Sequence, residues 1–167
     1  PHKVQEKNHP LINDMNSTIL MPHSRWNDIP KELFLEHGDR ILLESASAWV
    51  GLAVSRDFRY VMLQWHPEYE TASLAREYLR DRREWKTHEP IGYITEELRH
   101  IDPYKKTKTE ELIESSGLEN NWNDSAKVLF ARWMAIVYRL THFDIKKQYM
   151  DGIGREDPIG DLLKLEK

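Results

Sequence analysis

Residues 59–70, with the sequence RYVMLQWHPEYE, decide how this chain is organised. The run from Tyr60 to Trp65 is apolar, which predicts a buried strand. Pro67 has no backbone N–H to give to a sheet ladder, so the strand should end before it. Alternate residues of an extended chain point the same way. We therefore expect His66 and Glu68 to project together from the end of this strand.

An imidazole beside a carboxylate provides two of the three parts of a nucleophilic catalyst, a base and a group that orients it. The third part, the nucleophile, is missing, because a His-Glu pair at a strand end can serve a cysteine and the 167 residues contain none. Either the chain is not a catalyst, or its nucleophile lies on sequence outside these residues. A purely structural histidine at a strand end is the plainer alternative for His66.

Further short apolar runs, separated by polar breaks, indicate a sheet around this strand. We predict strands at Arg40–Ser45 and Ala48–Val54, and a shorter one at 18–21 that ends before Pro22. Ser24 would then lie on a loop at a strand end, where open α/β sheets bind ligands, although a turn-capping serine is an equally good interpretation. Trp49 and Trp65 are predicted to lie in the core.

Four helices are predicted from periodicity and punctuation. The first spans 28–38 and ends at Gly38, and the second runs from Glu70 or Thr71 to about Trp85. A capping box at 107–110 opens a third helix that ends at Gly117. The fourth spans 125–140, capped by Asn123 or Asp124, with apolar side chains at helical spacing, namely Ala126, Leu129, Phe130, Trp133, Val137 and Leu140.

The composition excludes several classes of function. The net charge of −4 gives no electrostatic reason to expect binding to nucleic acid or to an anionic membrane. No stretch of about twenty apolar residues is present, so no transmembrane helix is expected. The absence of cysteine excludes disulfides and fits a cytoplasmic protein. The eight histidines lack the spacing of metal ligands, so no metal is predicted.

Three stretches of the chain resemble a known family. The HPE of LQWHPEYE resembles the signature of the class I glutamine amidotransferase-like superfamily, whose triad is Cys-His-Glu. MPHSRW at 21–26 resembles the PHSR motif of the homoserine O-acyltransferase (homoserine transsuccinylase) family, and 129–144 resembles that family's C-terminal segment. His2–Val4 and His9–Leu11 also fall where the family has similar residues. The resemblance covers residues 2–145 and corresponds to the C-terminal half of a family member.

The resemblance implies an α/β fold, the C-terminal half of a class I glutamine amidotransferase-like (flavodoxin-like) three-layer fold. Residues 1–145 would form the C-terminal part of an acyltransferase domain, and 146–167 a C-terminal tail. The family's cysteine lies upstream of this segment. The expected partner is therefore a cysteine-bearing N-terminal half, as a separate chain or a missing segment, and we expect an oligomer.

The implied activity is transfer of an acyl group from acyl-CoA to the hydroxyl of homoserine or a similar amino acid, through a cysteine thioester. Acyl-CoA is then a substrate, and no cofactor is expected. His66 would be the general base and Glu68 the residue that orients it. Ser24 and Arg80 would position the acceptor, since a guanidinium pairs with a carboxylate in a bidentate manner.

The chain departs from the family between residues 86 and 125. Where the family has WRSH, this chain has Trp122-Asn123-Asp124-Ser125, which leaves the acyl group and the acceptor open. Two other functional classes also remain open. One is the corresponding half of a glutamine amidotransferase or γ-glutamyl hydrolase, which ammonia release from glutamine would reveal. The other is a non-catalytic interaction subunit, whose activity would survive a His66→Ala substitution.

Overall fold

The structure is a computed structural model that describes residues 1–84, 95–100, 102–104 and 106–165, with the backbone alone at residues 97 and 106–109. Its strands are β1 (His2–Val4), β2 (Thr18–Ile19), β3 (Arg40–Ser45), β4 (Trp49–Val54) and β5 (Val61–Leu63). Its helices are α1 (Lys31–Glu36), α2 (Ser73–Arg83), α3 (Glu96–His100), α4 (Lys106–Ser115), α5 (Asn123–Leu140) and α6 (Pro158–Leu165). The predicted α/β class is confirmed.

The five strands form one antiparallel sheet in the order β2-β1-β3-β4-β5. The predicted strand at Arg40–Ser45 is confirmed with the same bounds, and β4 begins one residue later than predicted. The predicted strand that leads to His66 is confirmed but shorter, because only Val61–Leu63 pair with β4. The order places β5, and with it the segment that follows, at one edge of the sheet.

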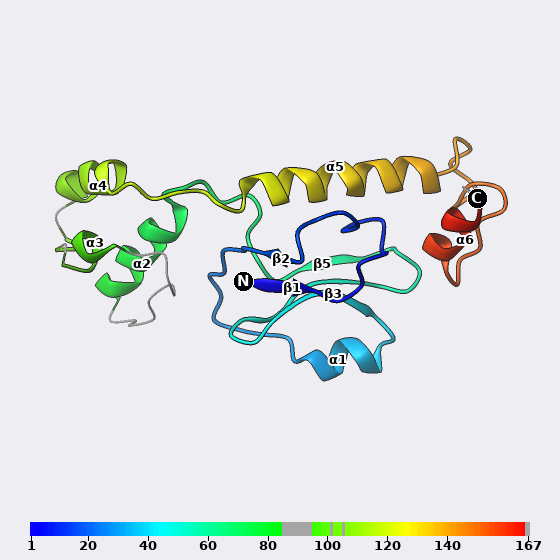
Figure 1. Ribbon diagram of the computed structural model, residues 1–167, viewed down its shortest axis with the longest axis horizontal. Coiled ribbons are helices and arrows are strands. Elements are labelled where there is room, and N and C mark those ends of the chain that lie inside the picture. The colour runs from blue at the N-terminus through cyan, green and yellow to red at the C-terminus, as the bar shows by residue number, and fades with distance from the viewer. Residues whose placement is uncertain (85–94, 101, 105, 166–167) are drawn as a thin grey trace.

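Helices cover both faces of the sheet (Figure 1). Phe34 of α1 packs with Ile41, Val50 and Ala53 on one face. On the other face, the alternate residues Leu42 and Leu52 pack in a larger core with the buried side of α5. This helix–sheet–helix arrangement, together with α6, is called the sheet module below.

Helices α2, α3 and α4 form a separate group beside the sheet, called the helical lobe below (Figure 1). Its core is small and comprises Ala75, Tyr78, Leu79, Leu98 and Ile113. The buried side chains of α2 are Leu74, Ala75, Tyr78 and Leu79, and Leu74 among them packs into the core of the sheet module. The end predicted for this helix at Trp85 lies outside the described residues, and α2 is described to Arg83.

Helix α5 differs from its prediction in its buried side. Ala126, Leu129 and Leu140 are buried as expected, but Ile136 takes the place predicted for Phe130 and Val137, which are exposed. The helix also begins at Asn123, and the side chain of Asn120 accepts its first N–H at 2.9 Å instead of the predicted Asn123 or Asp124 cap. A helix that is apolar on all sides does not reveal its buried side through spacing alone.

The two tryptophans predicted to lie in the core differ in their burial. Trp65 is buried, as predicted. Trp49 is 58% exposed, so its predicted burial is wrong. It lies at the β3–β4 hairpin with a positive φ of 51°, and this conformation points the indole away from the core.

The segment after α5 returns to the sheet module. The Tyr149 hydroxyl donates to the Asp57 carbonyl at 2.6 Å, which joins this segment to the β4–β5 turn. Ile159 and Leu162 of α6 belong to the main core. Both ends of α5 are therefore held to the sheet module.

Candidate active site

The segment after β5 turns sharply at the predicted place. The His66 N–H donates to the carbonyl of Pro22 at 3.0 Å, which ties the strand end to the MPHSRW loop. The Tyr69 N–H then donates back to the His66 carbonyl at 3.3 Å, closing a turn over Pro67 and Glu68. The chain thus presents His66 at a sheet edge, where the MPHSRW loop meets β5.

The structure brings together the two predicted catalytic side chains. Nδ1 of His66 lies 2.8 Å from Oε1 of Glu68. The His66 side chain is 35% exposed and that of Glu68 is 63% exposed, so a substrate or a partner chain can reach the pair. The carboxylate can only accept, so Nδ1 carries a proton and Glu68 fixes the orientation of the ring.

The other ring nitrogen of His66 meets the predicted Ser24, but through its backbone. Nε2 lies 3.1 Å from the Ser24 carbonyl oxygen, which is also an acceptor. Both contacts are hydrogen bonds at once only when the ring carries a proton on each nitrogen. The arrangement therefore suits the imidazolium form, which is the partner of a thiolate in cysteine-dependent catalysis.

Tyr69 is a site residue that the sequence did not single out. Its ring stacks on His66 with centroids 4.3 Å apart and an interplanar angle of 14°. Its hydroxyl donates to Oε2 of Glu77 at 2.8 Å. Burial, reinforced by Glu77, raises the pKa of Tyr69 to about 12, so the phenol remains protonated at neutral pH. The sequence feature that could have identified Tyr69 is its position inside LQWHPEYE, directly after Glu68.

Arg80 lies on α2, in the helical lobe, and is joined to the site through Glu77. Its guanidinium donates to Glu77 at 3.3 Å and to Asp81 at 2.9 Å. The Asp81 hydrogen bond is the main reason that the pKa of Arg80 is raised. Glu77 thus accepts from both Tyr69 and Arg80, and this shared carboxylate connects the predicted acceptor-binding arginine to the ring that covers His66.

Arg25 holds the MPHSRW loop in place. Its guanidinium donates to the carbonyls of Gln64 at 2.5 Å and Ala48 at 2.7 Å, and it also contacts His23. A salt bridge to Asp28 at 3.0 Å completes its contacts. The sequence singled out this motif for Ser24, whereas the structure assigns its arginine the role of fixing where the Ser24 carbonyl lies.

The MPHSRW loop is supported through its own His23, which packs on His2 of β1. His2 is buried and stacks on His23 with centroids 4.8 Å apart, and their Nε2 atoms are 3.1 Å apart. Burial lowers the pKa of His2 to about 4 and that of His23 to about 3. Both are neutral at neutral pH, so one can donate and the other accept. They are structural, whereas the side chain of His66 is 35% exposed.

A cavity of about 360 Å³ lies beside His66, between the end of β5 and the MPHSRW loop. That volume suits a small metabolite. Ser24 and Arg80 are not among the residues that line it. Its lining consists of Arg25, Asn27, Asp28, Ile29, Leu63, Gln64, Trp65 and His66.

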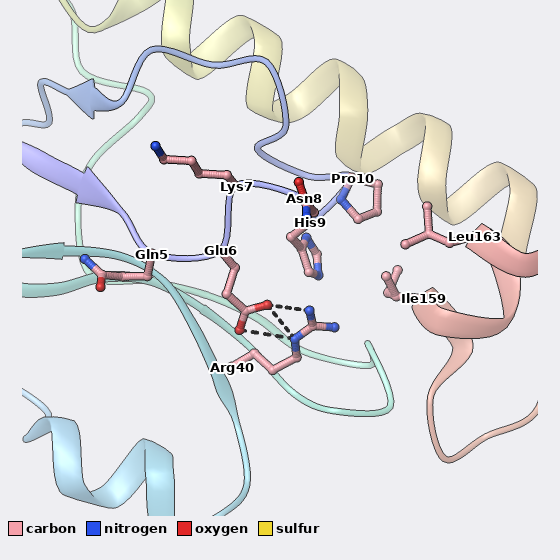
Figure 2. A pocket seen from close by; sticks show the side chains of 9 residues that line it. All are labelled: Gln5, Glu6, Lys7, Asn8, His9, Pro10, Arg40, Ile159 and Leu163. Atoms are coloured by element: carbon pink, nitrogen blue, oxygen red, sulfur yellow. Dashed lines mark hydrogen bonds and ion pairs between the residues drawn. The ribbon is translucent and has the colours of Figure 1, made fainter.

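A second cavity, of about 390 Å³, lies between the segment after β1 and helix α6 (Figure 2). Glu6 and Arg40 form an ion pair across it, and Ile159 and Leu163 supply the apolar side. His9 accepts a hydrogen bond from the Leu11 N–H, and burial lowers its pKa to about 4. None of the predicted site residues lines this cavity.

Two kinds of feature are absent from the described residues. No three His, Asp or Glu side chains among them gather closely enough to hold a metal ion. Within the same parts of the chain, no helix is both long enough and apolar enough to cross a membrane.

Comparisons with known proteins agree with the resemblance seen in the sequence. A family model described as homoserine O-succinyltransferase matches residues 1–143. Three curated proteins of that name, from Allochromatium vinosum, Thiothrix nivea and Methylobacter tundripaludum, are each 36% identical to this chain over 180 or 181 residues. The matches cover 95–96% of this chain but only 50–51% of each relative. The chain thus spans about half the length of the curated relatives it matches.

Proposed function

The chain belongs to the homoserine O-succinyltransferase family, and from this premise we propose that it carries the base-bearing half of an acyltransferase. The complete enzyme would move an acyl group from acyl-CoA to the hydroxyl of homoserine or a similar amino acid. The names of the relatives favour succinyl as that group. The observation that carries the proposal is the 2.8 Å contact between His66 and Glu68 at a sheet edge beside a cavity.

The first half-reaction would acylate a cysteine. Because the chain contains no cysteine, that residue would come from sequence outside these 167 residues. Its thiolate, paired with the His66 imidazolium, attacks the thioester carbonyl of acyl-CoA. The bond from the carbonyl carbon to the CoA sulfur breaks, and the CoA sulfur takes the proton from Nε2 of His66. The products are an acyl-cysteine and free CoA, with His66 now neutral at Nε2.

The second half-reaction would acylate the acceptor. Nε2 of neutral His66 takes the proton of the acceptor hydroxyl while the oxygen attacks the acyl-cysteine carbonyl. The cysteine sulfur leaves as a thiolate, and the imidazolium forms again beside it. Glu68 stabilises the imidazolium in both steps and keeps the Nδ1 proton in place. Arg80 is the candidate partner for the acceptor carboxylate, and Ser24 fixes the loop opposite His66.

The surface of α5 supports a covering partner half. The helix is exposed on the side away from the sheet, yet that side is mostly apolar. Such a surface is unusual in a protein without a partner. Its large exposed members are Val128, Phe130, Met134, Val137 and Tyr138, with exposed fractions between 37% and 84%. We assign the cysteine-bearing half as the partner because the relatives contain about as many further residues again.

Co-expression tests this function directly. The chain would be produced together with the part of the Allochromatium vinosum relative that it does not cover, and ester formation from succinyl-CoA and homoserine would be measured. His66→Ala should lower the rate at least about 100-fold, and Glu68→Gln at least roughly 10-fold. His37→Ala, at an exposed position on α1's C-terminal end, is the matched control and should leave the rate unchanged. Equal rates for His66→Ala and the control would contradict the proposal.

A further inference from the structure

We propose that Tyr69 is the positioning residue of this site, which holds the His66 ring by stacking and links it through its hydroxyl to the helix that bears Arg80. This inference rests on the proposed function for its catalytic consequence. Its structural part stands on the contacts of Tyr69 alone.

The stack supplies a restraint that the hydrogen bonds of His66 do not. Glu68 and the Ser24 carbonyl fix the ring in its own plane at Nδ1 and Nε2. Neither contact prevents the ring from tilting out of that plane, because both partners lie at its edge. Tyr69 covers one face of the ring at a centroid distance of 4.3 Å and 14° from parallel, which limits such tilting.

Tyr69 is itself held firmly. Its backbone carbonyl accepts from Nδ2 of Asn120 at 3.1 Å and from Nε1 of Trp122 at 3.0 Å. Trp122 is 2% exposed and belongs to the main core, just before α5. The position of the ring that covers His66 is therefore set by the core of the sheet module.

The hydroxyl of Tyr69 faces the helical lobe. It donates to Oε2 of Glu77, while Arg80 donates to Oε1 of the same carboxylate. Removing this hydroxyl would leave Glu77 free to pair more closely with Arg80. The guanidinium of Arg80 would then be less available to bind a substrate carboxylate. The stack and the hydroxyl therefore have separable consequences, one for the geometry of the base and one for acceptor binding.

Two substitutions separate these consequences. Tyr69→Phe keeps the stacked ring and removes the hydroxyl, whereas Tyr69→Leu removes both. The first readout is the NMR shift of the carbon-bound ring protons of His66 in the 167-residue chain. It needs neither substrate nor partner. Ring current from Tyr69 should place these signals upfield of those of His100, whose side chain is 83% exposed. The upfield position should persist in Tyr69→Phe and be lost in Tyr69→Leu.

The second readout is steady-state kinetics in the co-expressed enzyme. Tyr69→Leu should lower kcat roughly 10- to 100-fold because the base is misplaced. Tyr69→Phe should keep kcat and raise KM for the acceptor about fivefold, the worth of one hydrogen bond. Tyr60→Phe, at a residue that is 62% exposed just before β5, is the matched control and should change neither constant.

The outcomes distinguish this inference from the proposed function. If the ring protons of His66 have the same shifts in Tyr69→Leu as in the wild type, or if kcat is unchanged, the positioning role is refuted. If the shifts behave as expected but no variant or wild-type enzyme transfers an acyl group, the proposed function fails and the stack remains. Should Tyr69→Leu not fold, Tyr69→Met takes its place, because it is flexible and apolar but lacks a ring.

Discussion

The sheet module and the helical lobe differ in how they are held together. The sheet module has a continuous core to which both faces of β3 and β4, the buried side of α5 and α6 contribute. Among the described residues, the helical lobe has its own core of only five buried residues, while Leu74 of α2 packs into the main core. Side-chain contacts such as Arg76 to Glu110 and Arg82 to the Leu98 carbonyl join its helices. The predicted base lies on the first region and the predicted acceptor-binding arginine on the second. The contacts of Tyr69 connect them, so catalysis would depend on a firm region and acceptor binding on a weaker one.

Acidification should have the largest effect, and it should act on the sheet module. Burial lowers the pKa of His2 and His9 to about 4 and that of His23 to about 3, whereas an unfolded histidine titrates near 6.5. Between these values the unfolded chain binds more protons. Keeping these rings neutral therefore costs the folded state nothing above pH 6.5, and the free energy of unfolding decreases as the pH falls towards 4. Each histidine should contribute a slope of about 1.4 kcal/mol per pH unit in that window.

Urea unfolding between pH 7 and pH 5, followed by near-UV circular dichroism, measures this slope. His9→Gln should reduce the slope of the free energy of unfolding against pH by about the contribution of one histidine. His100→Gln is the control, since the side chain of His100 is largely exposed. A free energy of unfolding that does not change with pH would show that these histidines are not buried as neutral rings.

A matched pair of leucine deletions should separate the two regions. Leu42 in β3 and Leu98 in α3 are both 0% exposed. Leu42→Ala should lower the free energy of global unfolding by about 2–5 kcal/mol, because it opens a cavity in the continuous core. Leu98→Ala should open the helical lobe alone, because Leu98 belongs to the lobe's own small core and not to the main core.

Native-state hydrogen exchange distinguishes these outcomes. In Leu98→Ala, protection should fall in α2 and α3 while β3 and β4 keep theirs. A uniform loss of protection across both regions would show that they unfold as one cooperative unit.

Gly51→Ala should produce a smaller effect, confined to the support of the site. A Cβ at this position of β4 would lie 2.6 Å from Cδ2 of His2 and 3.1 Å from the sulfur of Met21. The clash should cost about 1–3 kcal/mol of stability. It should also disturb the His2–His23 stack, which two-dimensional NMR of the histidine rings would report. Gly154→Ala is a comparison at a glycine outside the sheet, where the nearest contact is a movable carboxylate at 3.1 Å. Unchanged ring signals of His2 in Gly51→Ala would contradict this account.

Arg76→Ala should have the smallest effect. Its guanidinium donates to Glu110 at 3.1 Å between α2 and α4, but both side chains are about half exposed. Exposed ion pairs contribute at most about 1 kcal/mol. A loss clearly above that value in urea unfolding would mean that the helical lobe depends on charge pairs more than its core suggests.

The sequence was sufficient to predict that His66 and Glu68 lie together after a strand, but not which residues support them. The apolar run, Pro67 and the spacing of two predicted the strand end and the joint projection of His66 and Glu68, and the 2.8 Å contact is consistent with that hypothesis. Tyr69 stood in the same stretch. Its stack on His66, however, depends on a turn held by Asn120 and Trp122, more than fifty residues later. A pairing so distant in the sequence leaves no local pattern.

Tertiary packing also explains the incorrect predictions for α5 and Trp49. Apolar side chains surround α5, so periodicity alone could not identify Ile136 as the buried member and Phe130 as an exposed one. The exposure of Trp49 follows from the geometry of a hairpin, where the backbone reaches positive φ and the side chain leaves the core. Large aromatic side chains favour burial on average, but a turn can override that tendency.

The most direct test of the central claim is the intact mass of the cysteine-bearing half. It would be measured after that half, co-purified with this chain, is incubated with succinyl-CoA and no acceptor. Transfer through a thioester predicts a succinyl adduct on the partner. The adduct should disappear when homoserine is added, and it should fail to form with His66→Ala in this chain. A partner that remains unmodified while ester product still accumulates on addition of homoserine would contradict the account, because the acyl group would then pass directly between substrates.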